Sequence, residues 1–84
     1  MNRKLFVGGL PWATTDEGLK KAFEQFGAIE DAKVVCERDT GRSRGFGFVT
    51  FMNEEDARAA QQAMHGKEIE GRQVRVDFAN SNPR

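Results

Sequence analysis

The sequence predicts an α+β domain in which a four-stranded antiparallel sheet carries two helices on one face. Three observations predict this class. Four segments alternate apolar and polar residues as strands do, two segments repeat apolar residues at helical spacing, and their order is strand, helix, strand, strand, helix, strand. That order contains two strand–helix–strand crossovers, and right-handed crossovers place both helices on the same side of the sheet. We therefore expect one covered sheet face and one bare face.

The first half of the chain supplies two strands and a helix. Residues 4–8 alternate and are followed by glycine and proline, so they predict the first strand. Thr14 and Glu17 have the separation of a capping box and predict the start of the first helix. Its apolar face is expected to comprise Leu19, Ala22, Phe23 and Phe26. Gly27 is expected to end the helix, and residues 29–36 predict the second strand.

The second half begins with a polar segment, residues 37–43, which predicts a loop. Residues 44–51 predict the third strand. Asn53 is expected to cap the second helix, and Gly66 to end it. The narrow apolar face of this helix consists of Ala57, Ala60 and Met64, whose two alanines would let it lie close to a sheet.

The last predicted strand covers residues 73–78, after a turn closed by Gly71. The whole order is β-α-β-β-α-β, which predicts a ferredoxin-like sandwich over residues 3–79, followed by a polar tail at 80–84. The Met1 start and the short tail suggest a complete small protein, and an excised domain would look the same.

Thirteen basic residues balance thirteen acidic ones, which argues against a binder that relies on bulk charge. A neutral domain can still place its cations on one face. Cys36 is the single cysteine, so we expect a reducing, intracellular location in the cytoplasm, with Cys36 in the core beside Val34. The single histidine, His65, is expected at the surface near a helix end. Because no catalytic triad, metal-ligand set or long apolar run is recognisable, we expect no enzyme activity, cofactor, metal or membrane span.

The third strand contains an unusual outward face. If Val49 and Phe51 point into the core with Gly45 and Gly47, then Arg44, Phe46, Phe48 and Thr50 point to the bare face. By the same alternation, Lys4 and Phe6 point outward from the first strand. Were these two strands neighbours, Phe6, Phe46 and Phe48 would form an aromatic platform flanked by Lys4 and Arg44. Such a surface suits flat bases beside phosphates. A register shifted by one residue is the alternative, and it would bury Arg44 at a high energetic cost.

These residues resemble a known family. Residues 44–51 match, at every position, the eight-residue ribonucleoprotein signature of the RNA recognition motif, and residues 5–10 resemble its six-residue companion motif. The resemblance covers residues 3–79. It is particularly close to plant-type glycine-rich RNA-binding proteins and to small bacterial relatives with a single domain. The glycine-rich tail of the plant proteins is absent from this sequence.

The resemblance implies roles for individual residues. Phe6 and Phe48 would each stack a base, Phe46 would pack against sugars, and Arg44 would hold a phosphate. The edges of the platform would be lined by Lys4, Lys33, Val35, Arg75 and Asp77. Arg38 and Arg42 would fold over the bound strand, and the main chain of residues 78–81 would add hydrogen bonds.

The expected function is binding of single-stranded RNA by a monomer, as an RNA chaperone or a post-transcriptional regulator. Single-stranded DNA is a further expected ligand in vitro, because stacking does not distinguish the sugars. The alternative is a peptide-binding module, although the aromatic residues are intact and the first helix carries Lys20 and Lys21. Two residues stay open: Trp12 either covers the core edge or contacts RNA, and Phe78 lies in the core or at its rim.

Overall fold

The computed structural model describes residues 3–11, 13–37, 39–41, 43–69 and 71–79, without the side chains of Ser43 and Arg44. Its elements are β1 (Lys4–Gly8), α1 (Asp16–Phe23), the 3-10 turn η1 (Glu24–Phe26), β2 (Ile29–Cys36), β3 (Ser43–Phe51), α2 (Glu54–Met64), β4 (Glu68–Ile69), β5 (Arg72–Gln73) and β6 (Arg75–Phe78). The predicted strands at 4–8 and 29–36 are confirmed.

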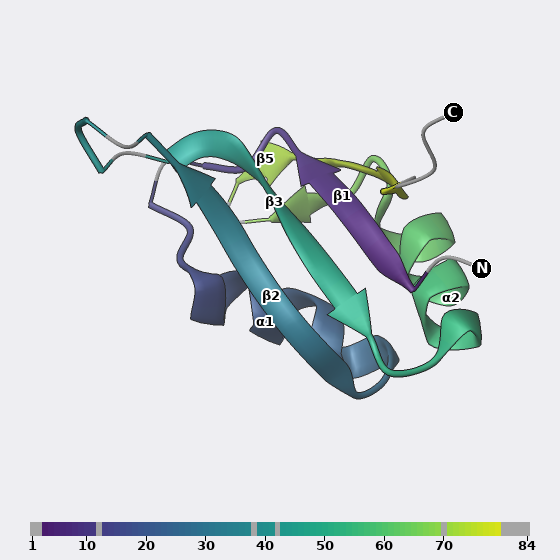
Figure 1. The fold of residues 1–84 in the computed structure, drawn as a ribbon. Coiled ribbons are helices and arrows are strands. Elements are labelled where there is room, and N and C mark those ends of the chain that lie inside the picture. The colour runs from purple at the N-terminus through teal and green to yellow at the C-terminus, as the bar shows by residue number, and fades with distance from the viewer. Residues whose placement is uncertain (1–2, 12, 38, 42, 70, 80–84) are drawn as a thin grey trace, which may run out of the picture.

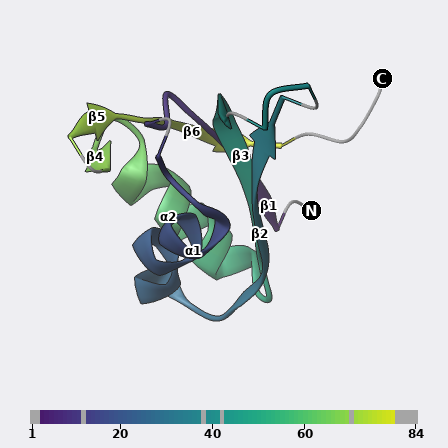
Figure 2. The ribbon, with the colours of Figure 1, turned by 90° about the vertical axis from the view of Figure 1, so that its left-hand side faces the viewer.

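The main sheet has four antiparallel strands in the order β2-β3-β1-β6, and β4 and β5 form a separate hairpin. Both helices cover one face of the main sheet, as Figures 1 and 2 show, and the opposite face is bare. The predicted ferredoxin-like α+β fold is therefore confirmed. It places β1 and β3 side by side at the centre of the sheet.

The core lies between the helices and the inner face of the sheet. Its strand residues are the inward members of the predicted alternation, including Leu5, Val7, Val49 and Phe51. The helices contribute Leu19 and Phe23 from α1, and Ala57, Ala60 and Met64 from α2. Ala22 and Phe26 are partly buried against this cluster. The predicted apolar faces of both helices are thus confirmed.

The N-cap of helix α1 lies one residue later in the sequence than predicted. The N-cap is Thr15, whose Oγ1 accepts a hydrogen bond from the backbone N of Gly18 at 3.1 Å. Thr14, the predicted cap, is buried, with 4% of its surface exposed. Two adjacent threonines give the same local signal, and only the position of the helix against the sheet distinguishes them. In α2 the N-cap is Asn53, as predicted, but its side chain makes no capping bond.

The last strand is shorter than predicted. Gln73 pairs with Glu68 in the β4–β5 hairpin, and the sheet strand begins only at Arg75. Between them, the N of Val74 donates to the O of Lys67 at 2.8 Å, which directs the chain toward the end of α2. Strands of two residues are too short to produce a recognisable alternation, so the hairpin had no signal in the sequence.

The prediction that Cys36 lies in the core is wrong, because its side chain is exposed. The pairing of β2 with β3 shifts between Val34, opposite Gly47, and Cys36, opposite Ser43. Gly45 has a φ of +86° within this irregular part of β3. Strict alternation along β2 therefore fails at its end. Gly45 was predicted to allow a close helix, but a Cβ there would meet only the O of Leu10, at 3.8 Å.

Side chains from outside the sheet protect both edges of the main sheet. The backbone of Val76, on β6, accepts from Gln61 Nε2 at 3.0 Å and donates to His65 Nδ1 at 3.1 Å. The side chains of Gln61, in α2, and of His65, its C-cap residue, thus occupy the β6 edge. At the other edge, Asp16 Oδ1 accepts from the N of Val34 at 2.7 Å. Side chains from the helices thus pair backbone groups at both edges, where an exposed strand could pair with another chain.

Candidate nucleic-acid interface

Three phenylalanines lie together on the bare face of the sheet, and we call Phe6, Phe46 and Phe48 the aromatic cluster. Phe6 is opposite Phe48, and Gly8 is opposite Phe46, in the pairing of β1 with β3. The ring centroids are 5.5 Å apart for Phe6 and Phe46, 5.9 Å for Phe6 and Phe48, and 6.2 Å for Phe46 and Phe48. All three side chains are half-buried. The predicted register is therefore confirmed, and the alternative register is excluded.

Gly8 leaves room for the Phe6 ring to lie close against the backbone of the sheet. A Cβ at Gly8 would come within 3.0 Å of Cε2 and 3.2 Å of Cζ of Phe6. The ring of Phe6 thus lies over the backbone of Gly8, which is opposite Phe46 on β3 and Arg75 on β6. The sequence prediction read Gly8 only as the end of a strand. The signal that was missed is its position two residues after Phe6, on the same face.

Cations border the aromatic cluster. Lys4 Nζ lies 4.8 Å from the centroid of the Phe48 ring, a cation–π contact. Lys33 is opposite Phe48 on β2, and Arg75 is opposite Gly8 on β6; both are exposed. Asp77, also exposed, is opposite Phe6. Lys33, Phe48, Phe6 and Asp77 therefore follow one another across the four strands.

Of the remaining predicted site residues, Val35 is described in full, Arg44 by its backbone alone, and the others are not described. Val35 is half-buried on β2, near the irregular pairing with β3. Arg44 belongs to β3 by its backbone, but its side chain is outside the description. Arg38, Arg42, Trp12 and residues 80–81 lie outside the described residues, so the predictions for them stay predictions.

Phe78 lies near the end of β6, opposite Leu5. Its side chain is 38% exposed, so it is at the rim of the core and not within it. The next residue, Ala79, donates its backbone N–H to the O of Lys4 at 2.9 Å. This bond holds the chain beside β1 beyond the last strand residue.

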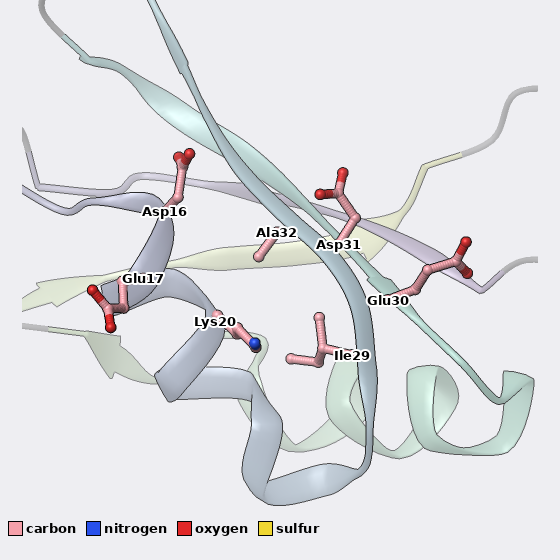
Figure 3. A pocket seen from close by; sticks show the side chains of 7 residues that line it. All are labelled: Asp16, Glu17, Lys20, Ile29, Glu30, Asp31 and Ala32. Carbon is pink, nitrogen blue, oxygen red and sulfur yellow. The ribbon is translucent and has the colours of Figure 1, made fainter.

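The carboxylates are concentrated elsewhere. A cavity of about 390 Å³ lies between α1 and β2, and Figure 3 shows Lys20 and Ile29 facing one another across it. Its other lining residues are Asp16, Glu17, Glu30, Asp31 and Ala32. Two of these carboxylates are already engaged, because Glu30 Oε1 pairs with Arg3 at 3.3 Å and Asp16 Oδ1 accepts from the N of Val34, and Figure 3 shows Glu30 and Asp31 pointing away from the cavity. A chain with no net charge thus has cations beside the aromatic cluster and a cavity lined by acidic residues beside helix α1.

Two classes of site have no support among the described residues. No group of three or more His, Cys, Asp or Glu residues lies close enough there to hold a metal ion. None of the helices in the described part of the chain has both the length and the apolar character that a membrane span needs.

Curated relatives match nearly the whole chain. It is 55% identical over 83 residues to mitochondrial glycine-rich RNA-binding protein 2 of Arabidopsis thaliana, covering 99% of this chain and 52% of that protein. It is 55% identical over 78 residues to a glycine-rich RNA-binding protein of Daucus carota, covering 93% of this chain and 50% of that protein. The chain thus spans about half the length of these relatives.

Solved structures show the same fold. RNA binding protein PG1 superposes with a TM-score of 0.90 at 39% identity, covering 98% of this chain and 99% of that one. The second RNA recognition motif domain of a yeast poly(U)-binding protein gives a TM-score of 0.85 at 37% identity, covering 96% and 98% of the two chains. The family model described as RNA recognition motif matches residues 5–75. The chain therefore belongs to the RNA recognition motif family, as the residues of its first and third strands predicted.

Proposed function

We propose that this chain binds single-stranded RNA across the aromatic cluster. The observation that carries the proposal is the contact of Phe6, Phe46 and Phe48 on the bare sheet face, with the Lys4 amine over the Phe48 ring. Family membership supports it, as do relatives named RNA-binding proteins and a neighbour solved as a protein–RNA complex, with a TM-score of 0.91 at 29% identity. Half-buried rings lose little conformational entropy when a base stacks on them, because the sheet already holds them in place.

In the proposed complex, Phe6 and Phe48 each stack a base, and Phe46 packs against the sugars between them. Each stacked base is worth about 1–3 kcal/mol. Lys33, Arg75 and Arg44 neutralise phosphates, while Val35 and Asp77 line the edges where base atoms are recognised. Arg38 and Arg42 close over the strand. Stacking accepts single-stranded DNA as well, because it makes no use of the 2′-hydroxyl.

The proposed role is that of a binding protein and not of an enzyme. The chain acts as a monomer, either as an RNA chaperone or as a post-transcriptional regulator. The balance of thirteen basic and thirteen acidic residues points to modest affinity for one isolated domain. We propose an intracellular location; since the Arabidopsis relative is named mitochondrial, the cytoplasm is a prediction that the comparisons do not favour.

The test is a fluorescence-anisotropy titration of single-stranded RNA with a randomised sequence. The wild type is compared with the Phe6→Ala/Phe46→Ala/Phe48→Ala variant. Loss of two stacked bases would weaken binding by about 2–6 kcal/mol, which is at least about thirtyfold. Met52→Ala is the matched control, because Met52 is a large apolar side chain, 52% exposed, that lies outside the aromatic cluster. Equal affinity of the triple variant and the wild type would refute the proposal.

A peptide-binding role is the second candidate, and the cavity between α1 and β2 is the observation that favours it. Its lining combines acidic residues with the partly buried Ile29, so a basic segment with one apolar side chain would fit there. A lysine-rich peptide that binds the triple phenylalanine variant as well as the wild type, but not Glu17→Gln/Glu30→Gln, would establish this role. Absence of peptide binding by the wild type would exclude it.

A further inference from the structure

A second concavity shares one residue, Arg75, with the surroundings of the aromatic cluster. It has a volume of about 330 Å³ and lies where α2 ends beside the start of β6. Its lining consists of His65, Gly66, Gln73, Val74 and Arg75. Arg75 belongs to both surfaces, because on β6 it is opposite Gly8, over which the Phe6 ring lies. A strand that crosses the aromatic cluster toward β6 thus reaches this concavity next.

The hydrogen bond of His65 determines which of its ring nitrogens can donate. Nδ1 accepts from the backbone N of Val76 at 3.1 Å. A neutral imidazole that accepts at Nδ1 carries its proton on Nε2. Nε2 has no hydrogen-bond partner among the residues that the structure describes. His65 therefore offers one N–H donor in an orientation held by the sheet edge.

Two backbone carbonyls in the lining of this concavity are already paired. The O of Gly66 accepts from Gln73 Nε2 at 2.9 Å, and the O of Val74 accepts from the N of Gly66 at 2.9 Å. The O of Met64, at the end of α2, accepts from the N of Lys67 at 2.9 Å. None of the lining residues is a carboxylate. Two side chains of the lining can donate to a ligand, His65 through its imidazole N–H and Arg75 through its guanidinium, and both suit an anionic oxygen.

We propose that this concavity binds a backbone phosphate of the RNA strand after the strand has left the aromatic cluster past Arg75. The inference rests on the proposed function and extends it to His65, which no sequence pattern places in the site. A free phosphate ion offers the same oxygens. The RNA phosphodiester is the ligand we assign, because Arg75 joins the concavity to the surface on which the bases stack.

The variant His65→Asn separates the donor from the structural bond. The amide oxygen of asparagine takes the place of Nδ1 and accepts from Val76, whereas the donor at the position of Nε2 is lost. Its affinity is measured for RNA of randomised sequence as a tetramer, which the aromatic cluster accommodates, and as a decamer. We expect decamer binding to weaken by about three- to tenfold, the loss of one hydrogen bond, with tetramer affinity unchanged. Gln62→Asn, an exposed position on the same helix, is the matched control.

A second measurement observes the wild-type side chain directly. In ¹H–¹⁵N spectra of the imidazole, the Nε2 resonance of His65 should shift with the decamer and not with the tetramer. It should also stay in place with millimolar inorganic phosphate. Since this measurement needs no variant, it tests the inference even if His65→Asn lowers the melting temperature.

Unchanged decamer affinity of His65→Asn, together with an unshifted Nε2 resonance, would overturn the inference while leaving the proposed function intact. So would an equal loss for both lengths, which would mean that His65 acts on the aromatic cluster through the fold. An equally large shift with inorganic phosphate would overturn the assignment to RNA. Failure of the proposed function looks different: the triple phenylalanine variant would then bind the tetramer as well as the wild type does.

Discussion

At the scale of single residues, Gly47 shows how closely β3 packs against its neighbours. A Cβ there would come within 2.5 Å of the O of Lys33 and 3.1 Å of Cδ2 of Leu19. The first atom is backbone and cannot move aside without displacing β2. Gly47→Ala should therefore reduce the free energy of unfolding by about 1–3 kcal/mol, as measured by urea denaturation. Gly66→Ala is a useful comparison, because no atom lies within 4 Å of a Cβ there and only its φ of +84° opposes the change; a smaller loss for Gly47→Ala than for Gly66→Ala would contradict the packing argument.

The same scale shows where alternation along a strand predicts a side chain and where it fails. Gly47 was expected to allow close approach of a helix, and its distance to Leu19 of α1 confirms this. Cys36 was expected in the core by the same reasoning and is exposed. The difference is the shifted pairing beyond Val34, which changes the direction of later side chains without changing the sequence pattern.

At the scale of elements, helix α1 depends on its N-cap, Thr15, which the sequence analysis predicted one residue too early, at Thr14. Removal of the Thr15 hydroxyl leaves the N–H of Gly18 without its acceptor. We expect Thr15→Ala to lower the free energy of unfolding by about 1 kcal/mol, measured by thermal denaturation followed by circular dichroism. Thr15→Asp should stay near the wild type, because aspartate caps as well and suits the positive end of the helix. Equal losses for both variants would mean that the hydroxyl does not cap α1.

Helix α2 has a second use besides covering the core. Gln61 and His65, one turn apart, both bond to the backbone of Val76, so the helix also seals the β6 edge. The apolar spacing of Ala57, Ala60 and Met64 predicted which side of α2 faces the sheet. It contained no information on which polar side chains would reach the edge strand, because that depends on how far α2 extends along the sheet.

At the scale of the whole molecule, a single core joins both helices to the sheet. Phe23 has no exposed surface and Phe26 is only partly buried. Phe23→Ala should therefore destabilise the fold by about 3–5 kcal/mol, and Phe26→Ala by less, in one cooperative transition. Both are measured by urea denaturation with tryptophan fluorescence and circular dichroism. A cost for Phe26→Ala as large as that for Phe23→Ala would show that burial does not set the difference.

The arrangement of charge also belongs to this scale. The chain has no net charge, yet three cations, Lys4, Lys33 and Arg75, border the aromatic cluster beside a single carboxylate opposite it, Asp77, while four carboxylates line the cavity beside α1. The composition alone could only argue against a binder driven by bulk charge. The grouping of the three cations arises from the fold, because Lys4, Lys33 and Arg75 lie on three different strands that the sheet brings together.

The sequence by itself determined the order of the elements, the inward and outward residues of β1 and β3, and hence the aromatic cluster. These follow from periodicity within one element and from crossover handedness, which are local or topological properties. Only the tertiary structure decided the cap of α1, the exposed Cys36, the β4–β5 hairpin, and the bond that orients His65 at the β6 edge. Each of these depends on the register or distance between segments that are far apart in the chain, and no local pattern of residue types specifies such distances.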